Sequence, residues 1–191
     1  MRVTWLLLLA LLLPLPGTAP ALAQFPAGYD KYGRDCAKVQ RQVWGKRWSP
    51  ILLAQIEQES SWNPAARSPW ASGLAQFIPA TQGAVEREYG LIGDIYDPMH
   101  ACLLQAFHMR DLARSTGSKF DGFYGQWAAA LRSYNGSPAS FWCEHRKAGE
   151  PRDVWLMDPF SCRKAAFHHE NTEYPRRILF QRFPRYYWEW N

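Results

Sequence analysis

The segment 51–59, Ile-Leu-Leu-Ala-Gln-Ile-Glu-Gln-Glu, constrains the fold of this chain most, because it predicts a helix that is largely buried. Ser49 and Pro50 form a favourable start, with a serine at the cap and a proline in the first turn. Asn63-Pro64 stops the helix, because the residue before a proline disfavours helical geometry. Other elements must cover such an apolar helix, and its last carboxylate, Glu59, then lies at the edge of a core.

The rest of the sequence predicts a mainly α-helical domain, since apolar residues recur at helical spacing and strand signals are weak. Further helices are expected over residues 32–44, 81–89, 97–114, 120–133 and 173–183. Loops are expected at 64–79 and 90–96, and residues 137–170 are expected to be an irregular insert, long for an ordinary connection. The aromatic tail 186–190 either folds back on the domain or touches a membrane surface or a partner.

Residues 1–23 have the pattern of a secretory signal peptide. Met1-Arg2 gives a positive start, residues 5–13 form an apolar core, and Ala21-Leu22-Ala23 is a cleavage site of the A-x-A type. An uncleaved membrane anchor is the alternative, but the apolar run is shorter than the ~20 residues of a membrane span. The sequence therefore predicts an exported, periplasmic protein whose mature part, 24–191, is one domain.

Four cysteines follow the predicted signal peptide, and an even number in an exported chain favours two disulfides. Three pairings are open. Cys143–Cys162 is favoured because the two residues bracket one loop, which leaves Cys36–Cys102. A catalytic thiol or a zinc site is the alternative, but the sequence has no nucleophile signature around a cysteine and no C-x-x-C.

The charge of the chain restricts its partners only loosely. A formal net charge of +5 favours anionic partners such as cell-wall polymer, phospholipid head groups or nucleic acid. Nucleic acid is not expected, because zinc-finger spacing and an RNA-binding aromatic signature are both lacking. No cofactor and no metal is expected either, since the adjacent His168 and His169 without further spaced ligands are typical of a polar loop.

Glu59 is the strongest candidate for a catalytic group. It ends the apolar helix and precedes the polar turn 60–64, Ser-Ser-Trp-Asn-Pro, so partial desolvation should raise its pKa and let it hold a proton near neutral pH. A carboxylic acid that faces a polar cleft is what cleavage of a glycosidic bond requires. Glu57 is the alternative acid but points to a different face of the helix. A salt-bridging role at the helix end is the alternative for Glu59.

Four sequence elements in a fixed order carry a resemblance to a known family. They are residues 59–81 (ESSWNP, then SPWASGLAQFIPAT), Asp97-Pro98, residues 133–136 (SYNG) and residues 170–179 (ENTEYPRRIL). Together they resemble the lytic transglycosylases of the soluble-transglycosylase (SLT) type, relatives of goose-type lysozyme. The resemblance spans most of the predicted mature chain and implies a lysozyme-like α-helical domain with the disulfide-pinned insert at about 137–170.

The resemblance also implies roles for individual residues. Glu59 would be the single acid and base that cleaves the bond between N-acetylmuramic acid and N-acetylglucosamine and leaves a 1,6-anhydro ring. Hydrogen bonds to sugar and acetamido groups are implied for four residues: Ser68, Gln76, Tyr134 and Asn135. Tyr174 would hydrogen-bond near Glu59 and position it. For all five, ordinary capping or packing is the alternative.

This chain departs from the family pattern at four places. Trp70 stands where the family usually has two residues, Ala75 replaces the usual methionine, Gly136-Ser137 replaces Ala-Gly, and Pro175 replaces a valine. None of these changes removes the acid. They bear on the contacts to the sugars and on subsite preference.

Two other functions remain open from the sequence. A hydrolytic muramidase would use water in place of the sugar hydroxyl, positioned by Asp94 or Asp97. A non-catalytic wall-binding or scaffold module would use the same fold to dock on peptidoglycan strands. For either enzyme or module, a secretion- or conjugation-type envelope machine is a candidate partner, because relatives of this fold open the wall for such machines.

Overall fold

The computed structural model describes residues 24–45, 48 and 50–190, and it confirms the mainly α class. The predicted signal peptide and the predicted cap at Ser49 lie outside the described residues. The helices, in chain order, are α1 (Ala27–Trp44), α2 (Ile51–Ser60), α3 (Pro79–Tyr89), α4 (Pro98–Ser115), α5 (Gly122–Gly136), α6 (Pro138–Lys147), α7 (Ala165–Arg176) and α8 (Phe183–Trp190). Short 3-10 helices lie at Gly117–Lys119 and Val154–Met157, and within the described ranges the only β structure is two isolated bridges.

Helix α2 is the core of the domain, as its apolar sequence predicts. Every side chain from Ile51 to Ile56 is fully buried. The helix packs against α1, against α8 and against the π-helical segment Arg177–Arg182 that precedes α8. Helices α1 and α4 lie against each other. The disulfide Cys36–Cys102 joins them covalently.

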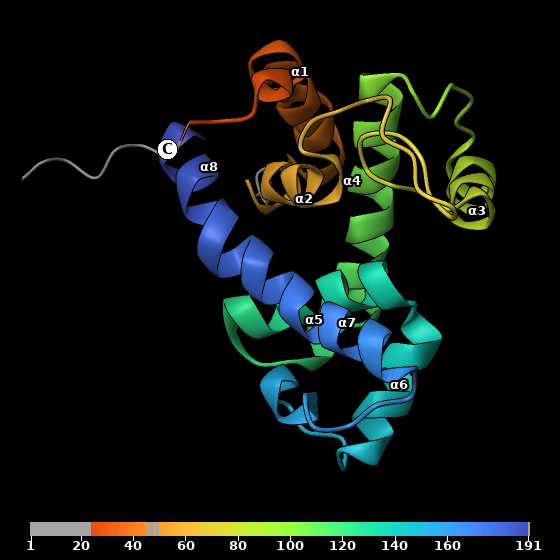
Figure 1. Ribbon diagram of the computed structural model, residues 1–191, viewed down its shortest axis with the longest axis vertical. Coiled ribbons are helices and arrows are strands. Elements are labelled where there is room, and N and C mark those ends of the chain that lie inside the picture. The colour runs from red at the N-terminus through yellow and green to blue at the C-terminus, as the bar shows by residue number, and fades with distance from the viewer. Residues whose placement is uncertain (1–23, 46–47, 49, 191) are drawn as a thin grey trace, which may run out of the picture.

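The described chain ends in one long helical rod, which runs from the side of α5 and α6 to the side of α1 and α2 (Figure 1). Helix α7, the π-helical segment and α8 follow one another without interruption from 165 to 190 (Figure 1, blue). The helix predicted over 173–183 is therefore shorter at both ends than the continuous helical rod that the structure shows. Pro175 lies inside α7 rather than limiting it, and a π-helical segment follows, an irregularity that proteins tolerate within long helices.

The aromatic tail folds back on the domain. Tyr186 is fully buried, and the indole N–H of Trp190 donates to the Tyr29 hydroxyl at 2.9 Å. Of the two alternatives that the sequence leaves open for residues 186–190, the structure thus shows the first. Tyr186 and Trp190 pack between α8 and α1, whereas Tyr187 and Trp188 are exposed.

The insert is more regular than the sequence predicts. Residues 137–170 contain α6, a 3-10 helix and the first turns of α7, so the expectation of an irregular segment is wrong. Ser137 caps α6 by accepting from the N–H of Ser140, and Pro138 occupies the first turn. This is the helix-start pattern that Ser49-Pro50 also shows, but at 137–138 it follows directly on a helix end. The disulfide Cys143–Cys162 joins α6 to the segment before α7, so both pairings are the favoured ones.

None of the helices within the described ranges is both long and apolar enough to cross a membrane.

Candidate active site around Glu59

The carboxyl end of α2 is a sharp turn with a strained backbone. Ser61 and Trp62 have φ angles of 49° and 64°, a left-handed conformation that is uncommon for residues other than glycine. The buried Trp62 side chain holds the turn, since its indole N–H donates to the Tyr186 hydroxyl at 2.8 Å. Glu59, in the last helical turn, is therefore fixed relative to the core.

The structure separates the two candidate acids, Glu57 and Glu59. The Glu57 carboxylate accepts from the Tyr186 hydroxyl at 2.7 Å and pairs with the guanidinium of Arg185. It is the anchor of α8 on α2. The Glu59 carboxylate instead faces α7, where Tyr174 donates its hydroxyl proton to Oε1. The prediction that the two side chains point to different faces is confirmed by these contacts.

The surroundings of Glu59 favour its protonated form. Burial raises the pKa of Glu59 to about 8, because the charged form loses hydration. The hydrogen bond from Tyr174 opposes this shift, and the negative charge of Glu170 adds to it. At neutral pH most molecules therefore carry a proton on Glu59, which is the state that a general acid needs.

The loop before α3, residues 64–78, is held in shape by side chains to which the resemblance assigns sugar binding. Nε2 of Gln76 donates to the carbonyls of Ala66 and Gly73, at 3.2 and 2.9 Å. The Ser68 hydroxyl accepts from the N–H of Ala71 at 2.9 Å and closes the tip. Both side chains thus hold loop backbone, and a sugar contact by Gln76 would use its amide oxygen.

Two contacts attach this loop to the rest of the domain. Gly73 has a φ of 77°, and a Cβ there would lie 2.3 Å from the carbonyl oxygen of Ile95, so only glycine permits this approach. The Tyr134 hydroxyl donates to the carbonyl of Ala75 at 2.7 Å. Burial raises the pKa of Tyr134 well above its usual value, and the charge of Glu59 raises it further. Tyr134 and Tyr174 thus both lie within electrostatic reach of the acid.

Asn135 is held by a residue of α7. Its amide oxygen accepts from Nδ2 of Asn171 at 3.0 Å, and Asn171 also donates to the backbone carbonyl of Arg132 at 2.8 Å. The Asn171 amide oxygen in turn accepts from Nε of Arg132 at 3.3 Å. Asn171 is fully buried. The position of Asn135 therefore depends on a side chain that a substrate cannot contact.

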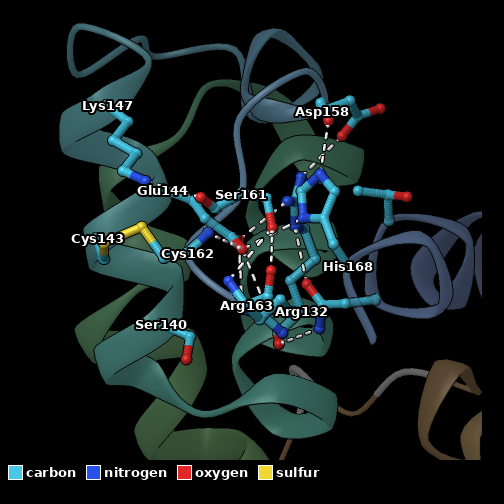
Figure 2. A network of polar contacts seen from close by, with 12 residues as sticks. Arg132, Ser140, Cys143, Glu144, Lys147, Asp158, Ser161, Cys162, Arg163 and His168 are labelled. Carbon is cyan, nitrogen blue, oxygen red and sulfur yellow. Dashed lines mark hydrogen bonds and ion pairs between the residues drawn. A yellow bond between two sulfur atoms is a disulfide. The ribbon is translucent and has the colours of Figure 1, made fainter. Parts of the chain in front are cut away.

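Arg132 belongs to a buried ionic network, which Figure 2 shows. Fully buried Glu144 accepts from Arg132 at 3.3 Å and from two nitrogens of Arg163 at 2.9 and 3.2 Å. Asp158 accepts from Arg132 at 2.8 Å. His168 lies 3.3 Å from Glu144 through Nδ1 and 2.8 Å from the Asp158 carbonyl through Nε2. The network connects α5, α6 and α7, and it lies beside the Cys143–Cys162 disulfide, since the N–H of Cys162 donates to Glu144.

The network explains why Gly136 stands where the resembled family has alanine. A Cβ at 136 would lie 1.7 Å from Nη1 of Arg163 and 2.7 Å from Nδ2 of Asn171. The guanidinium cannot move away freely, because it is bound to Glu144. The Arg163 side chain can therefore occupy its position only because residue 136 has no Cβ.

Gly136→Ala is expected to destabilise the protein by about 1–3 kcal/mol, the usual cost of overpacking. The measurement is chemical denaturation. Gly83→Ala is the matched control, because Gly83 also lies in a helix and its Cβ would meet only the flexible end of Arg87, at 3.2 Å. That variant should gain stability from the better helix propensity of alanine. Equal stability changes in the two variants would contradict the role of Arg163.

Gln55, Gln105 and Asn171 belong to the surroundings of the site but are not among the residues that the sequence predicts for it. All three are fully buried polar side chains. The signal for Gln55 was present, since an amide within a helix predicted to be buried needs hydrogen-bond partners. No local pattern marked Gln105 or Asn171, whose partners are far away in the sequence.

A protein-family model described as Transglycosylase SLT domain matches residues 38–154, which is more than half of the chain. The match includes Glu59, the loop 64–78, Tyr134 and Asn135, and it ends before Tyr174. A search of curated proteins finds no match to the chain. The helical architecture with two disulfides agrees with the expected lysozyme-like domain.

Proposed function

Because this chain belongs to the transglycosylase SLT domain family, we propose that it is an exported lytic transglycosylase of peptidoglycan. The family assignment supports transglycosylase-type cleavage of the wall polymer in general. The proposal goes further and names the β-1,4 bond between N-acetylmuramic acid and N-acetylglucosamine, with a 1,6-anhydromuramoyl product. One observation carries it: the Glu59 carboxyl lies at the end of the buried helix α2 and accepts a hydrogen bond from Tyr174, and burial raises its pKa to about 8, so that it is protonated at neutral pH.

Glu59 serves the reaction twice. It first donates its proton to the glycosidic oxygen, while the bond from that oxygen to the anomeric carbon breaks. It then accepts the proton of the C6 hydroxyl, whose oxygen forms the new bond to the anomeric carbon. No water is consumed, and the carboxylic acid is restored. Ordinary glycosidases need a second carboxylate at a defined separation, whereas the acetamido oxygen of the substrate can stabilise the cationic centre here.

The remaining site residues take roles that follow from their contacts. Tyr174 positions Glu59 through its hydrogen bond to Oε1. Tyr134 and Gln76 hold the loop 64–78 beside the acid and offer their remaining polar atoms to the sugar. Asn135 and Ser68 contribute further hydrogen bonds to sugar and acetamido groups. Trp70, which is 77% exposed at the loop tip, offers its ring for stacking on a pyranose.

The products of the reaction test this proposal. The experiment is mass spectrometry of the fragments that the purified protein releases from peptidoglycan, with Glu59→Gln as control. We expect anhydromuramoyl ends that disappear in the variant, since an amide cannot donate the proton. Reducing ends, heavier by one water, would instead indicate a muramidase.

One finding bears on the competing hydrolytic function. Asp94 and Asp97, the candidates for holding a hydrolytic water, each accept from a backbone N–H two residues on, both at 2.9 Å, and so serve as local caps. A non-catalytic wall-binding module would release no products, and it would bind peptidoglycan equally well with Glu59→Gln. Local wall opening for a secretion- or conjugation-type machine remains a prediction, tested by capture of such components with the purified protein.

The pH dependence of the reaction should respond to Glu170. Activity is expected to fall as pH rises through the pKa of Glu59, because the acid loses its proton there. Glu170→Gln removes a negative charge that raises this pKa, so the falling limb should move to lower pH. Rates measured from pH 5 to 10 test this prediction. Glu173→Gln, one turn further along α7 and paired with Arg176, is the control that should leave the limb in place.

A further inference from the structure

A row of buried amides leads from α1 to Glu59. Gln40, Gln105 and Gln55 are fully buried and come from α1, α4 and α2. Nε2 of Gln40 donates to Oε1 of Gln105 at 2.8 Å, and Nε2 of Gln105 donates to Oε1 of Gln55 at 2.9 Å. Nε2 of Gln55 donates to the Tyr174 hydroxyl at 3.1 Å, and that hydroxyl donates to Oε1 of Glu59. Every donor in the row points toward the carboxylate.

Two groups that cannot reverse fix this direction. The carbonyl of Leu52 only accepts and lies 3.0 Å from the end of the Gln105 amide that also meets Gln55, so that end must be the nitrogen. At the far end, the indole N–H of Trp48 only donates, and it meets Gln40 at 3.4 Å, so that atom must be the oxygen. Turning either amide would bring two acceptors or two donors together.

The fixed direction determines where the proton of Glu59 resides. The Tyr174 oxygen already accepts from Gln55, and its single proton goes to Oε1 of Glu59. An Oε1 that accepts this hydrogen bond cannot carry a proton along the same line. The protonated carboxyl must therefore carry its proton on Oε2.

We propose that Gln105 and Gln55 are positioning residues that lock the Tyr174 hydroxyl as a donor to Oε1 of Glu59, so that Oε2 is the oxygen that carries the catalytic proton whenever Glu59 is protonated. The inference rests on the proposed function in that Glu59 is taken as the acid. A general acid works only when its proton faces the reacting oxygen, and a carboxyl free to exchange the roles of its oxygens would spend part of its time in a wrong state. The row removes that freedom.

The titratable groups that act on Glu59 are few. Tyr174 and Glu170 face it from α7, and Tyr134 senses its charge from α5. Glu57, on the same helix, is paired with Arg185 on the other face. The pKa of Glu59 therefore reports on the hydrogen bond from Tyr174 directly.

Gln55→Met tests the proposal, because methionine has a similar length but neither donates nor accepts in place of the amide. Tyr174 then loses its donor and becomes free to accept a proton from Glu59. The anion is less well stabilised, so the pKa of Glu59 should rise by about one unit, a tenfold change in its protonation equilibrium. The measurement is a carbon-13 NMR titration of the Glu59 side-chain carboxyl. We also expect kcat to fall about tenfold with KM little changed.

Gln40→Met is the matched control. Gln40 is equally buried and belongs to the same row, but its loss leaves Gln105 held in direction by Leu52. Stability should fall as in Gln55→Met, while the pKa of Glu59 stays at its wild-type value. Equal pKa shifts in both variants would overturn the proposal, because they would reflect general loosening of the core. If Gln55→Met does not fold, Gln105→Met is the second variant. It should also raise the pKa of Glu59.

A further control separates the row from a simple change in polarity. In a Tyr174→Phe background the row no longer reaches Glu59, so Gln55→Met should add no further pKa shift. An additional shift of the same size would overturn the proposal. The titration needs no substrate, so it tests the positioning role even if the product analysis were to refute the proposed function.

Discussion

Glu144→Gln is expected to lower the free energy of unfolding by about 3–5 kcal/mol, because it leaves buried positive charge without its partner. The substitution keeps the shape of the side chain and removes only the charge. Arg132, which is fully buried, would retain Asp158, while Arg163 would lose the carboxylate that binds it through two nitrogens. Chemical denaturation measures the effect, and thermal unfolding should show a lower midpoint.

Asp121→Asn is the matched control for that variant. It breaks a pair of the same chemical kind, Asp121 with Arg152, whose side chains are 63% and 73% exposed. Water already solvates both groups there, so we expect no measurable change in stability. Similar losses in the two variants would contradict the importance of burial. Glu144→Gln should also weaken activity, because Arg132 and Asn171 hold Asn135.

Glu59→Gln is expected to raise the free energy of unfolding by about 3 kcal/mol at pH 7, although we also expect it to abolish activity. Burial raises the pKa of Glu59 from the model-compound value of 4.5 to about 8 in the folded protein. Between these two values the unfolded chain releases a proton that the folded protein keeps, so stability falls as pH rises. A glutamine has no such proton, and it can still accept from Tyr174.

The pH dependence of this gain in stability tests whether it comes from the raised pKa of Glu59. Below the unfolded pKa both states hold the proton, so the variant and the wild type should unfold at the same denaturant concentration near pH 4. The gain should grow up to the folded pKa and remain constant above it. Glu57→Gln provides the contrast, because Glu57 is paired with Arg185 and Tyr186, and its loss should destabilise the protein. A gain in Glu59→Gln that does not vary with pH would contradict the assigned protonation state.

Local signals predicted much of the fold. The helix at 51–59 and its stop at Asn63-Pro64 are found almost as expected, and Asp97 caps α4 by accepting from Met99. Helix caps and apolar spacing act over a few residues, so the sequence displays them directly. In the insert the same local signals mislead. Ser137-Pro138 follows directly on the end of α5, so that its helix-start signal cannot be told from the continuation of a loop.

In the candidate site, too, the sequence predicts local features but not contacts between distant residues. Glu59 was predicted from a local feature, a carboxylate at the end of an apolar helix. Its partner Tyr174 is 115 residues away, and the row through Gln55 and Gln105 joins segments 50 residues apart. A buried amide in a sequence says that it needs partners, but it does not say which ones.

The sequence by itself therefore determined the helical class, the acid and the order of the elements around it, because each depends on neighbouring residues. Only the tertiary structure decided the protonation of that acid and the direction of its hydrogen bonds. Those properties depend on desolvation and on contacts between helices, which exist only once α2, α4 and α7 have packed together.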